Sequence, residues 1–175
     1  MPLRPGPLQK IVSGGQTGVD RAALDAALEA QLACGGWCPR ERAAEDGVIP
    51  ARYPLAETPG RDPAQRTAWN VRDSDATLIL VRGLPRGGTA LSAERAAAEG
   101  RPCRIVDLAA GPDPGDVRAW IRGAGAQVLN VAGPRESEAP GIHDEALALL
   151  RAVLESDGTG SPLHPPGEND RSNRG

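Results

Sequence analysis

The stretch IVSGGQTGVDRAALDAA, residues 11–27, decides the fold of this chain. It begins as a short apolar strand, breaks at Gly14 and Gly15, and resumes with Ala and Leu at helical spacing. Similar strand and helix patterns alternate along the rest of the chain. The predicted strands are 10–13, 76–81, 103–108 and 127–133, and the predicted helices are 20–31, 64–72, 90–99, 113–123 and 141–154. We therefore predict an α/β fold, a Rossmann-like three-layer α/β/α arrangement with a mostly parallel central sheet.

The length and composition predict one folded domain with two short ends. The chain has 175 residues, enough for one domain with a substantial core. We expect an N-terminal extension over 1–9, a Rossmann-like ligand-binding domain over 10–154, and a disordered tail over 155–175, where the sequence is polar and rich in Gly and Pro. Residues 34–60 show no clear period, which predicts a long shaped loop with one short strand near 53–56.

The charge and the cysteine content argue against several classes of partner. A formal net charge of −3 gives no overall basic field, so we expect neither nucleic acid nor a membrane surface as a partner. No apolar stretch has the length of a signal peptide or a membrane span, so the expected location is the cytoplasm. The three cysteines are an odd and sparse set, and we expect them to be reduced thiols.

The first glycine turn, SGGQTGVD, lies where a strand gives way to a helix. Ligands of open α/β sheets bind at such carboxyl ends of strands. Gly14 and Gly15 let a ligand approach the main chain, and the free N–H groups of the following helix favour an anion. Thr17 and Asp20 also have the spacing of a capping box, which would explain both as a helix start alone. Taken by itself, this motif leaves the two interpretations even.

Two further loops between strands and helices carry similar residues. In RGLPRGGTALSAE, residues 82–94, Gly87, Gly88 and Thr89 open a helix. Two Gly-Gly turns in one small domain favour a shared phosphate site over two independent tight turns. In the loop after the last strand, Arg135 is either a bidentate clamp for an anion or a solvated ion pair with the neighbouring glutamates.

Five segments together resemble one bacterial protein family. They are SGGQTGVDRAALDAA (13–27), GGWCPRERAAEDGVIPARYPL (35–55), QRTAWNVRDSDATLIL (65–80), GGTALSAE (87–94) and LNVAGPRESEAPGI (129–142). In this order they resemble the molybdenum carrier family, which is similar to a circularly permuted branch of the SLOG, or LOG-like, Rossmannoid superfamily. The resemblance covers about residues 10–154. Rossmann-like members of that superfamily bind nucleotide-derived ligands, and their relatives include the cytokinin-activating phosphoribohydrolases.

The resemblance implies a ligand pocket built from the three loops. Its cofactor-binding residues would be Gly14, Gly15, Gln16, Thr17, Asp20, Gly87, Gly88, Thr89, Arg135, Glu136 and Ser137. The phosphoribohydrolases carry a P-G-G-x-G-T-x-x-E motif with a catalytic Glu. Here Arg86 replaces the Pro, the glycine run is contracted, and Glu94 lies five residues beyond the Thr. An enzyme of this fold would use Glu94, Glu136 or Asp20 as its acid or base.

Metal ligands and aromatic rings are sparse in this sequence. Cys34 and Cys38 form the one cysteine pair, and no second Cys or His pair stands near them in sequence, so we predict no metal site. Cys38 either touches a sulfur-bearing or metal-bearing cofactor or is a small buried hydrophobe. Trp37 and Trp69 either stack on a purine or pterin ring or pack within the protein.

The function that we favour is a binding or carrier protein rather than an enzyme. It would hold a pterin-type molybdenum cofactor, or a related nucleotide-derived ligand, by its phosphate on the glycine turns. The alternatives are a nucleotide-processing enzyme such as a LOG-like N-glycosidic hydrolase, and a nucleotide-sensing SLOG module. The expected partner is a small phosphorylated ligand. The protein partners considered are a second copy of the chain, which would give a homo-oligomer, and a molybdoenzyme or a cofactor-synthesis enzyme.

Overall fold

The computed structural model describes residues 6–155. The first five residues of the expected N-terminal extension lie outside the described residues, as does all of the expected disordered tail except Glu155. Within the extension, Leu8 packs against the core, and the amides of Gln9 and Lys10 both donate to the carbonyl oxygen of Gln127.

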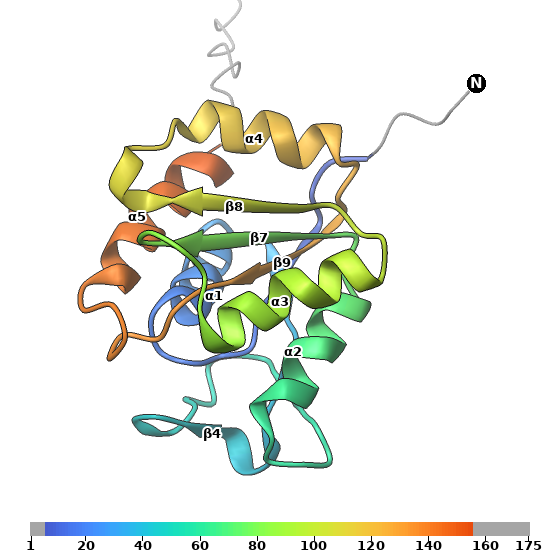
Figure 1. The fold of residues 1–175 in the computed structure, drawn as a ribbon, viewed down its shortest axis with the longest axis vertical. Helices are drawn as coiled ribbons and strands as arrows, with labels where there is room; N and C mark the ends of the chain where they lie inside the picture. The colour runs from blue at the N-terminus through green and yellow to red at the C-terminus, as the bar shows by residue number, and fades with distance from the viewer. Residues whose placement is uncertain (1–5, 156–175) are drawn as a thin grey trace, which may run out of the picture.

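Five parallel strands form the central sheet (Figure 1). They are β1 (Lys10–Val12), β2 (Ala33–Gly35), β7 (Ala76–Val81), β8 (Cys103–Asp107) and β9 (Val128–Ala132), in the spatial order β2-β1-β9-β7-β8. Every pairing is parallel, so the sheet predicted as mostly parallel is parallel throughout. The chain builds β1 and β2 toward one edge and β7 and β8 toward the other, and β9 fills the centre. This reversal is the point at which open α/β sheets bind ligands.

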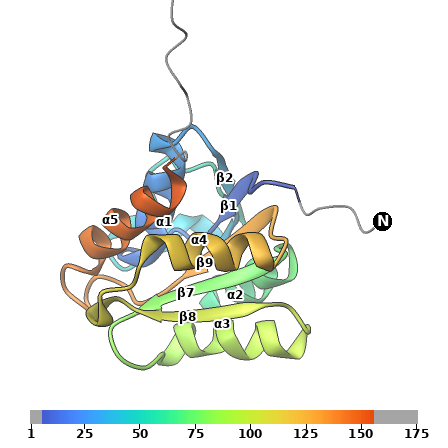
Figure 2. The ribbon, with the colours of Figure 1, turned by 90° about the horizontal axis from the view of Figure 1, so that it is seen from above.

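Helices cover both faces of the sheet, as the predicted three-layer arrangement requires (Figure 2). On one face lie α1 (Val19–Glu29), α4 (Pro114–Gly123) and α5 (Ile142–Leu154), and on the other lie α2 (Pro63–Arg72) and α3 (Gly87–Ala98). Each predicted helix forms, although α3 begins at Gly87 rather than at residue 90. None of the described helices is long and apolar enough to span a bilayer.

The core lies between these layers, and the end of β9 packs closely against β7 and α1. All residues of β7 are buried, as its continuously apolar sequence predicted. Ile11 and Leu129, from β1 and β9, pack with the apolar sides of α1 and α5. A Cβ at Gly133 would lie 2.3 Å from the carbonyl oxygen of Leu80 and 2.5 Å from Val19 Cγ2. Only glycine fits there, and the end of β9 is therefore held tightly between β7 and the first turn of α1.

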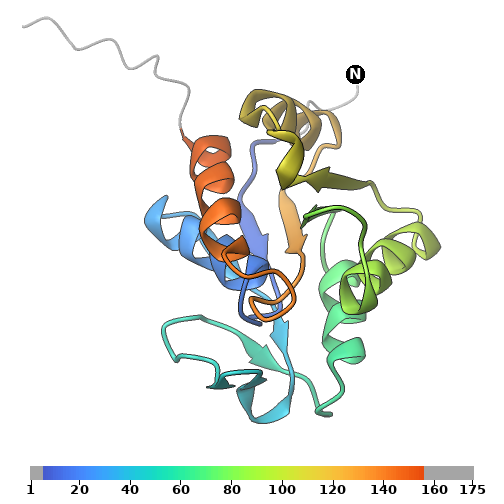
Figure 3. The same ribbon diagram turned by 60° about the vertical axis from the view of Figure 1, so that its left-hand side comes forward.

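The segment between β2 and α2 forms a small layer beyond the carboxyl ends of the strands (Figure 3). In it, β3 (Trp37–Cys38) pairs in parallel with β6 (Ala56–Glu57), and β4 (Ala43–Ala44) pairs antiparallel with β5 (Gly47–Val48). The 3-10 turn η1 (Arg40–Arg42) also lies in this segment, whereas a second 3-10 turn, η2 (Leu108–Ala110), follows β8. Leu24, Cys38, Ile49 and Tyr53 form a separate buried cluster, which fixes this segment onto α1.

The prediction of one long loop over residues 34–60 is wrong. Its first residues belong to β2, which pairs with β1 from Lys10–Ala33 to Val12–Gly35 as an edge strand of the sheet. The sequence of β2 is only ACG, and a partly exposed edge strand of three residues has no apolar pattern to reveal it. The short strand expected near 53–56 lies at Ala56–Glu57.

Candidate functional site

A pocket of about 400 Å³ opens at the carboxyl ends of β1, β9 and β7. It lies between the loop after β1, the first turns of α2 and α3, and the loop after β9, so it occupies the switch point of the sheet. It is lined by Gln16, Asp20, Asp62, Pro63, Ala64, Arg66, Thr67, Gly87, Gly88, Thr89, Leu91, Ser92, Ala132, Gly133, Arg135 and Glu138. Its volume falls in the range of small-molecule sites.

Helix α3 begins at this pocket without a side-chain cap. Its N-cap residue, Arg86, makes no capping hydrogen bond from its side chain, and the amides of Gly87 and Gly88 have no acceptor among the described residues. Gly87 has a φ of 49°, which favours glycine. A Cβ at Gly88 would meet no atom within 4 Å, so the backbone here faces open space. The turn therefore presents free N–H groups at the positive end of a helix dipole.

Arg66 of α2 and Asp20 of α1 form a buried ion pair at the pocket. Arg66 Nη1 lies 2.7 Å from Asp20 Oδ2, and the two side chains are only 14% and 5% exposed. Asp20 Oδ2 also accepts a hydrogen bond from the backbone N–H of Gln16 at 3.3 Å. The guanidinium packs directly on Gly14, because a Cβ at that residue would lie 1.6 Å from Arg66 Nη1. Gly14 therefore makes room for an arginine of the protein itself.

The capping box that was one interpretation of Thr17 and Asp20 does not form. Helix α1 begins at Val19 after Gly18 as N-cap, and no side chain caps it. Asp20 is engaged with Arg66, and Thr17 points to another loop. Gly18 has a φ of 79°, and a Cβ there would lie 2.4 Å from the carbonyl oxygen of Pro134. Packing against the loop after β9 therefore fixes the start of α1.

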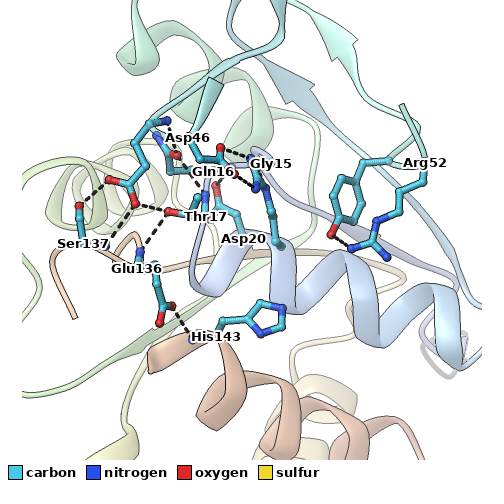
Figure 4. A network of polar contacts seen from close by, with 12 residues as sticks. Gly15, Gln16, Thr17, Asp20, Asp46, Arg52, Glu136, Ser137 and His143 are labelled. Atoms are coloured by element: carbon cyan, nitrogen blue, oxygen red, sulfur yellow. Dashed lines mark hydrogen bonds and ion pairs between the residues drawn. The ribbon is translucent and has the colours of Figure 1, made fainter. Parts of the chain in front are cut away.

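Glu45, in the turn between β4 and β5, contacts the loop after β1 and the loop after β9. Figure 4 shows that Thr17 and Ser137, its partners from these two loops, lie close together. Its carboxylate accepts hydrogen bonds from the Thr17 hydroxyl and from the amide and hydroxyl of Ser137. Gln16 Oε1 accepts from the amides of Thr17 and Glu45, each at 3.0 Å. Hydrogen bonds from Ser137 and Thr17 hold the pKa of Glu45 below its ordinary value. The neighbouring Asp46 pairs with Arg21.

The loop after β9 places Arg135 at the pocket, whereas the Glu136 side chain binds the start of α5. Arg135 Nε lies 3.1 Å from Glu138 Oε1 and 3.7 Å from Glu45 Oε2, so it makes the exposed ion pair that the sequence allowed as one interpretation. The Glu136 carboxylate accepts from the amides of Gly141 and His143, and thus caps the start of α5. This cap ties the loop to the helix that follows it.

His143 bridges two carboxylates next to this cap. Its Nε2 lies 2.9 Å from Asp25 Oδ2 and its Nδ1 lies 3.0 Å from Asp144 Oδ1. Burial lowers the pKa of His143, but the carboxylates of Asp144 and Asp25 outweigh burial, and the pKa lies above its ordinary value. The Tyr53 hydroxyl donates to Asp25 at 2.8 Å, and burial together with that carboxylate raises the pKa of Tyr53 to about 12. The cluster links α5, α1 and the 36–62 segment.

The structure divides the eleven predicted ligand residues into two groups. Gln16, Asp20, Gly87, Gly88, Thr89 and Arg135 line the pocket. Gly14, Gly15, Thr17, Glu136 and Ser137 are not in the lining, and their contacts hold the surrounding loops in place. Glu94, the candidate acid of a hydrolase, is exposed on α3 and does not line the pocket.

The roles of Arg66, which lines the pocket, and of Glu45, which holds the loops beside it, were not predicted from the sequence. Arg66 stands among polar residues on a helix, and such an arginine ordinarily indicates a solvated face. Glu45 and Asp46 stand ahead of Gly47 in a segment without periodicity, where a polar turn is the simplest interpretation. One sequence signal could have indicated Arg66: the first turns of α2 carry an unusual number of polar residues, with Gln65 and Thr67 beside it.

The cysteines and tryptophans lie apart from the pocket lining. Cys38 is buried, Cys34 is half-buried and Cys103 is exposed, and all three are free thiols. No three His, Cys, Asp or Glu side chains within residues 6–155 are grouped as ligands for a metal ion. Trp37 and Trp69 contact each other edge to face with ring centroids 4.7 Å apart, and Trp37 Nε1 donates to Asp73 at 2.8 Å. They therefore pack within the protein.

Comparison with known proteins covers the whole domain. Residues 11–154 match the circularly permutated YpsA SLOG family. The crystal structure of "Putative molybdenum carrier protein" from Syntrophus aciditrophicus SB, at 1.45 Å resolution, is similar with a TM-score of 0.80 and 42% sequence identity, over 85% of this chain and 96% of that chain. No curated protein is significantly similar to the chain. The resemblance inferred from the five motifs is thus confirmed, and the chain belongs to the circularly permutated YpsA family of SLOG proteins.

Proposed function

We propose that this protein is a binding or carrier protein that holds a phosphorylated pterin or nucleotide-like ligand in the pocket at the start of α3. One observation carries the proposal: the uncapped amides of Gly87 and Gly88 open onto the same pocket as the guanidinium of Arg66. The name of the relative from Syntrophus supports a molybdenum-related ligand, and a pterin-type molybdenum cofactor carries the phosphate that this turn would bind.

The phosphate of the ligand would lie on the first turn of α3. Free N–H groups and the helix dipole together make such a turn a binding site for an anion. The open space at Gly88 lets a phosphate oxygen reach the main chain, since nothing within 4 Å stands where a side chain would begin. The Thr89 hydroxyl belongs to the same lining and offers a further hydrogen-bond donor to the phosphate.

The remainder of the ligand would occupy the space between α2 and the loop after β9. Pro63, Ala64 and Leu91 give this part an apolar surface, and Gln16 and Arg66 give it hydrogen-bonding groups. An apolar patch beside placed hydrogen-bonding groups suits a heterocyclic ring. Molybdenum on a pterin would then be cargo held through the organic ligand, because the donors lining the pocket suit phosphate and ring atoms.

The engagement of the pocket carboxylates favours binding over hydrolysis. Asp20 is paired with Arg66, Glu138 is paired with Arg135, and Asp62 caps α2 by accepting from the Ala64 amide at 2.9 Å. A general acid or base must be within hydrogen-bond reach of the reacting atom and have a suitable pKa. Carboxylates held by arginines and by a helix start are poorly placed for that role, which is why a carrier is our conclusion.

The direct experiment is gentle purification followed by native mass spectrometry and elemental analysis for molybdenum. A retained phosphorylated pterin with molybdenum supports the cofactor carrier. A retained nucleotide without metal supports the phosphate site and contradicts the molybdenum cofactor as ligand. Incubation with nucleoside monophosphates, followed by chromatography for free base, tests the enzyme alternative, and release of base would contradict the carrier. No retained ligand and no binding of nucleoside monophosphates would overturn the proposal.

A further inference from the structure

Arg66 has one edge of its guanidinium without a partner, although it is nearly buried. Nη1 binds Asp20, whereas Nε is buried and has no hydrogen-bond partner among the described residues. No hydrogen bond or ion pair joins Nη2 to the described residues either. The Nε–H and one Nη2–H of a guanidinium point in the same direction, so this edge is a two-donor fork that matches two neighbouring acceptors. A buried donor left without an acceptor is destabilising, which points to an acceptor outside the chain.

The charge of Arg66 is already neutralised, and this narrows the class of acceptor. Asp20 lies 2.7 Å from Nη1 and is itself buried, so the pair carries no net charge. Asp62 and Glu138 add carboxylates to the same lining. The guanidinium of Arg135 also lines the pocket, but it is paired with Glu138. A second phosphate or a carboxylate at the free edge would therefore face a lining in which carboxylates outnumber guanidiniums. A neutral pair of acceptors, a carbonyl oxygen beside a ring nitrogen, needs only the hydrogen bonds.

We propose that Arg66 determines specificity by binding the adjacent carbonyl oxygen and ring nitrogen of a 6-oxopurine, the pattern that guanine presents. Guanine offers the O6 and N7 acceptors on one edge, whereas adenine offers N7 beside an amino group that repels the donor fork. The inference rests on the proposed function, since it takes the phosphate of the same ligand to lie at Gly88. It names the ligand as a guanine-type nucleotide.

The orientation of the fork is fixed before the ligand binds. The guanidinium is held on one side by Asp20 and packs on Gly14, where no side chain fits. Asp20 in turn accepts a hydrogen bond from the backbone N–H of Gln16. A donor pair that is already fixed loses little conformational entropy on binding, so its hydrogen bonds discriminate well between acceptors. Asp20 is accordingly a positioning residue for Arg66.

The test compares the binding of GMP and AMP by calorimetry to the full chain. We expect GMP to bind about tenfold more tightly than AMP, the discrimination of one good bidentate contact. Equal binding of the two would overturn the role of Arg66 while leaving the proposed function standing. If neither nucleotide binds, and inorganic phosphate does not bind either, the proposed function fails together with this inference.

Two variants test the residue itself. Arg66→Lys keeps the positive charge beside Asp20 but removes the fork, so we expect the ratio of GMP affinity to AMP affinity to fall to about one; a preference for GMP that survives would overturn the inference. Asp20→Asn leaves Arg66 charged and unbalanced, so inorganic pyrophosphate should bind more tightly than to the wild type. Unchanged binding of pyrophosphate would contradict the charge argument. The wild-type comparison stands even if a variant fails to fold.

Discussion

Arg66 Nη1 lies 2.7 Å from Asp20 Oδ2 and occupies the space in which a side chain at Gly14 would begin. The first glycine turn, the helix α2 and the start of α1 therefore depend on one another. The glycine that the sequence suggested for close approach of a ligand serves a close approach of the arginine, which in turn faces the pocket. A ligand in the proposed site would therefore contact the Arg66 side chain here, rather than the main chain of Gly14.

Gly14→Ala tests this packing. The added methyl group must displace the Arg66 guanidinium, and we expect a loss of about 1–3 kcal/mol in the free energy of unfolding, as for overpacking in a core. Urea denaturation measures it. Gly123→Ala is the matched control, because a Cβ at Gly123 meets no atom within 4 Å, and it should leave stability equal or higher. Equal stability of both variants would contradict the packing of Arg66 on Gly14.

Glu136→Ala tests whether this residue acts on the helix or on the ligand. Because its carboxylate caps α5 through the amides of Gly141 and His143, we expect a loss of about 0.5–2 kcal/mol in stability. Binding of GMP should be unchanged once the variant is folded. Thermal unfolding and calorimetry measure the two effects. A variant that is as stable as the wild type but no longer binds GMP would show that Glu136 binds the ligand rather than stabilising α5.

The raised pKa of His143 predicts a pH-dependent contribution to stability. Its protonated form is favoured in the folded state, so the contribution is complete below the ordinary histidine pKa of 6.5 and is lost as the pH rises through the higher pKa of the folded protein. We expect the wild type to exceed His143→Gln in Tm by more at about pH 5.5 than at about pH 8.5. A difference in Tm that grows with pH would contradict the bridge to Asp25 and Asp144.

Glu45→Gln tests the attachment of the turn between β4 and β5. The variant keeps the size of the side chain but replaces the charged acceptor of the Thr17 and Ser137 hydroxyls with a weaker, neutral one. We expect faster amide hydrogen exchange at residues 43–48, with exchange in the central sheet unchanged. Since the pKa of Glu45 is lowered, the wild type should show the same loosening as the pH falls below the ordinary value of 4.5. Unaltered exchange would argue that the turn is held by other contacts.

The sequence predicted the layers of this fold because they depend on period and hydrophobicity. The continuous apolar run of β7 and the helical spacing in α1 and α5 are local signals, and each of those elements formed. The edge strand β2 has three residues and contacts one neighbour, so burial imposed no pattern on it. Local signals carry little information about such short edge elements.

The site was predicted only where it lies on a strand-to-helix turn. Gly87 and Gly88 open the helix that follows β7 after a loop of residues 82–86, and parallel topology alone brings them to the carboxyl edge of the sheet. Arg66 reaches the pocket through the packing of α2 beside α3, and Glu45 reaches Thr17 and Ser137 through contacts far apart in sequence. Thr17 and Asp20 fit a local capping motif, but their side chains bind Glu45 and Arg66, which are distant in sequence. Contacts of that range have no local signature.

The phosphate on the first turn of α3 is the central claim, and one calorimetric comparison tests it most directly. The difference in affinity between GMP and guanosine isolates the phosphate contribution. Gly88→Asp places a negative charge in the open space at this turn, where an acidic residue is favourable to the helix and repels an anion. Gly88→Ala is the matched control with the same room and no charge. We expect the preference for GMP over guanosine to persist in Gly88→Ala and to vanish in Gly88→Asp, whereas an undiminished preference in Gly88→Asp would contradict the account.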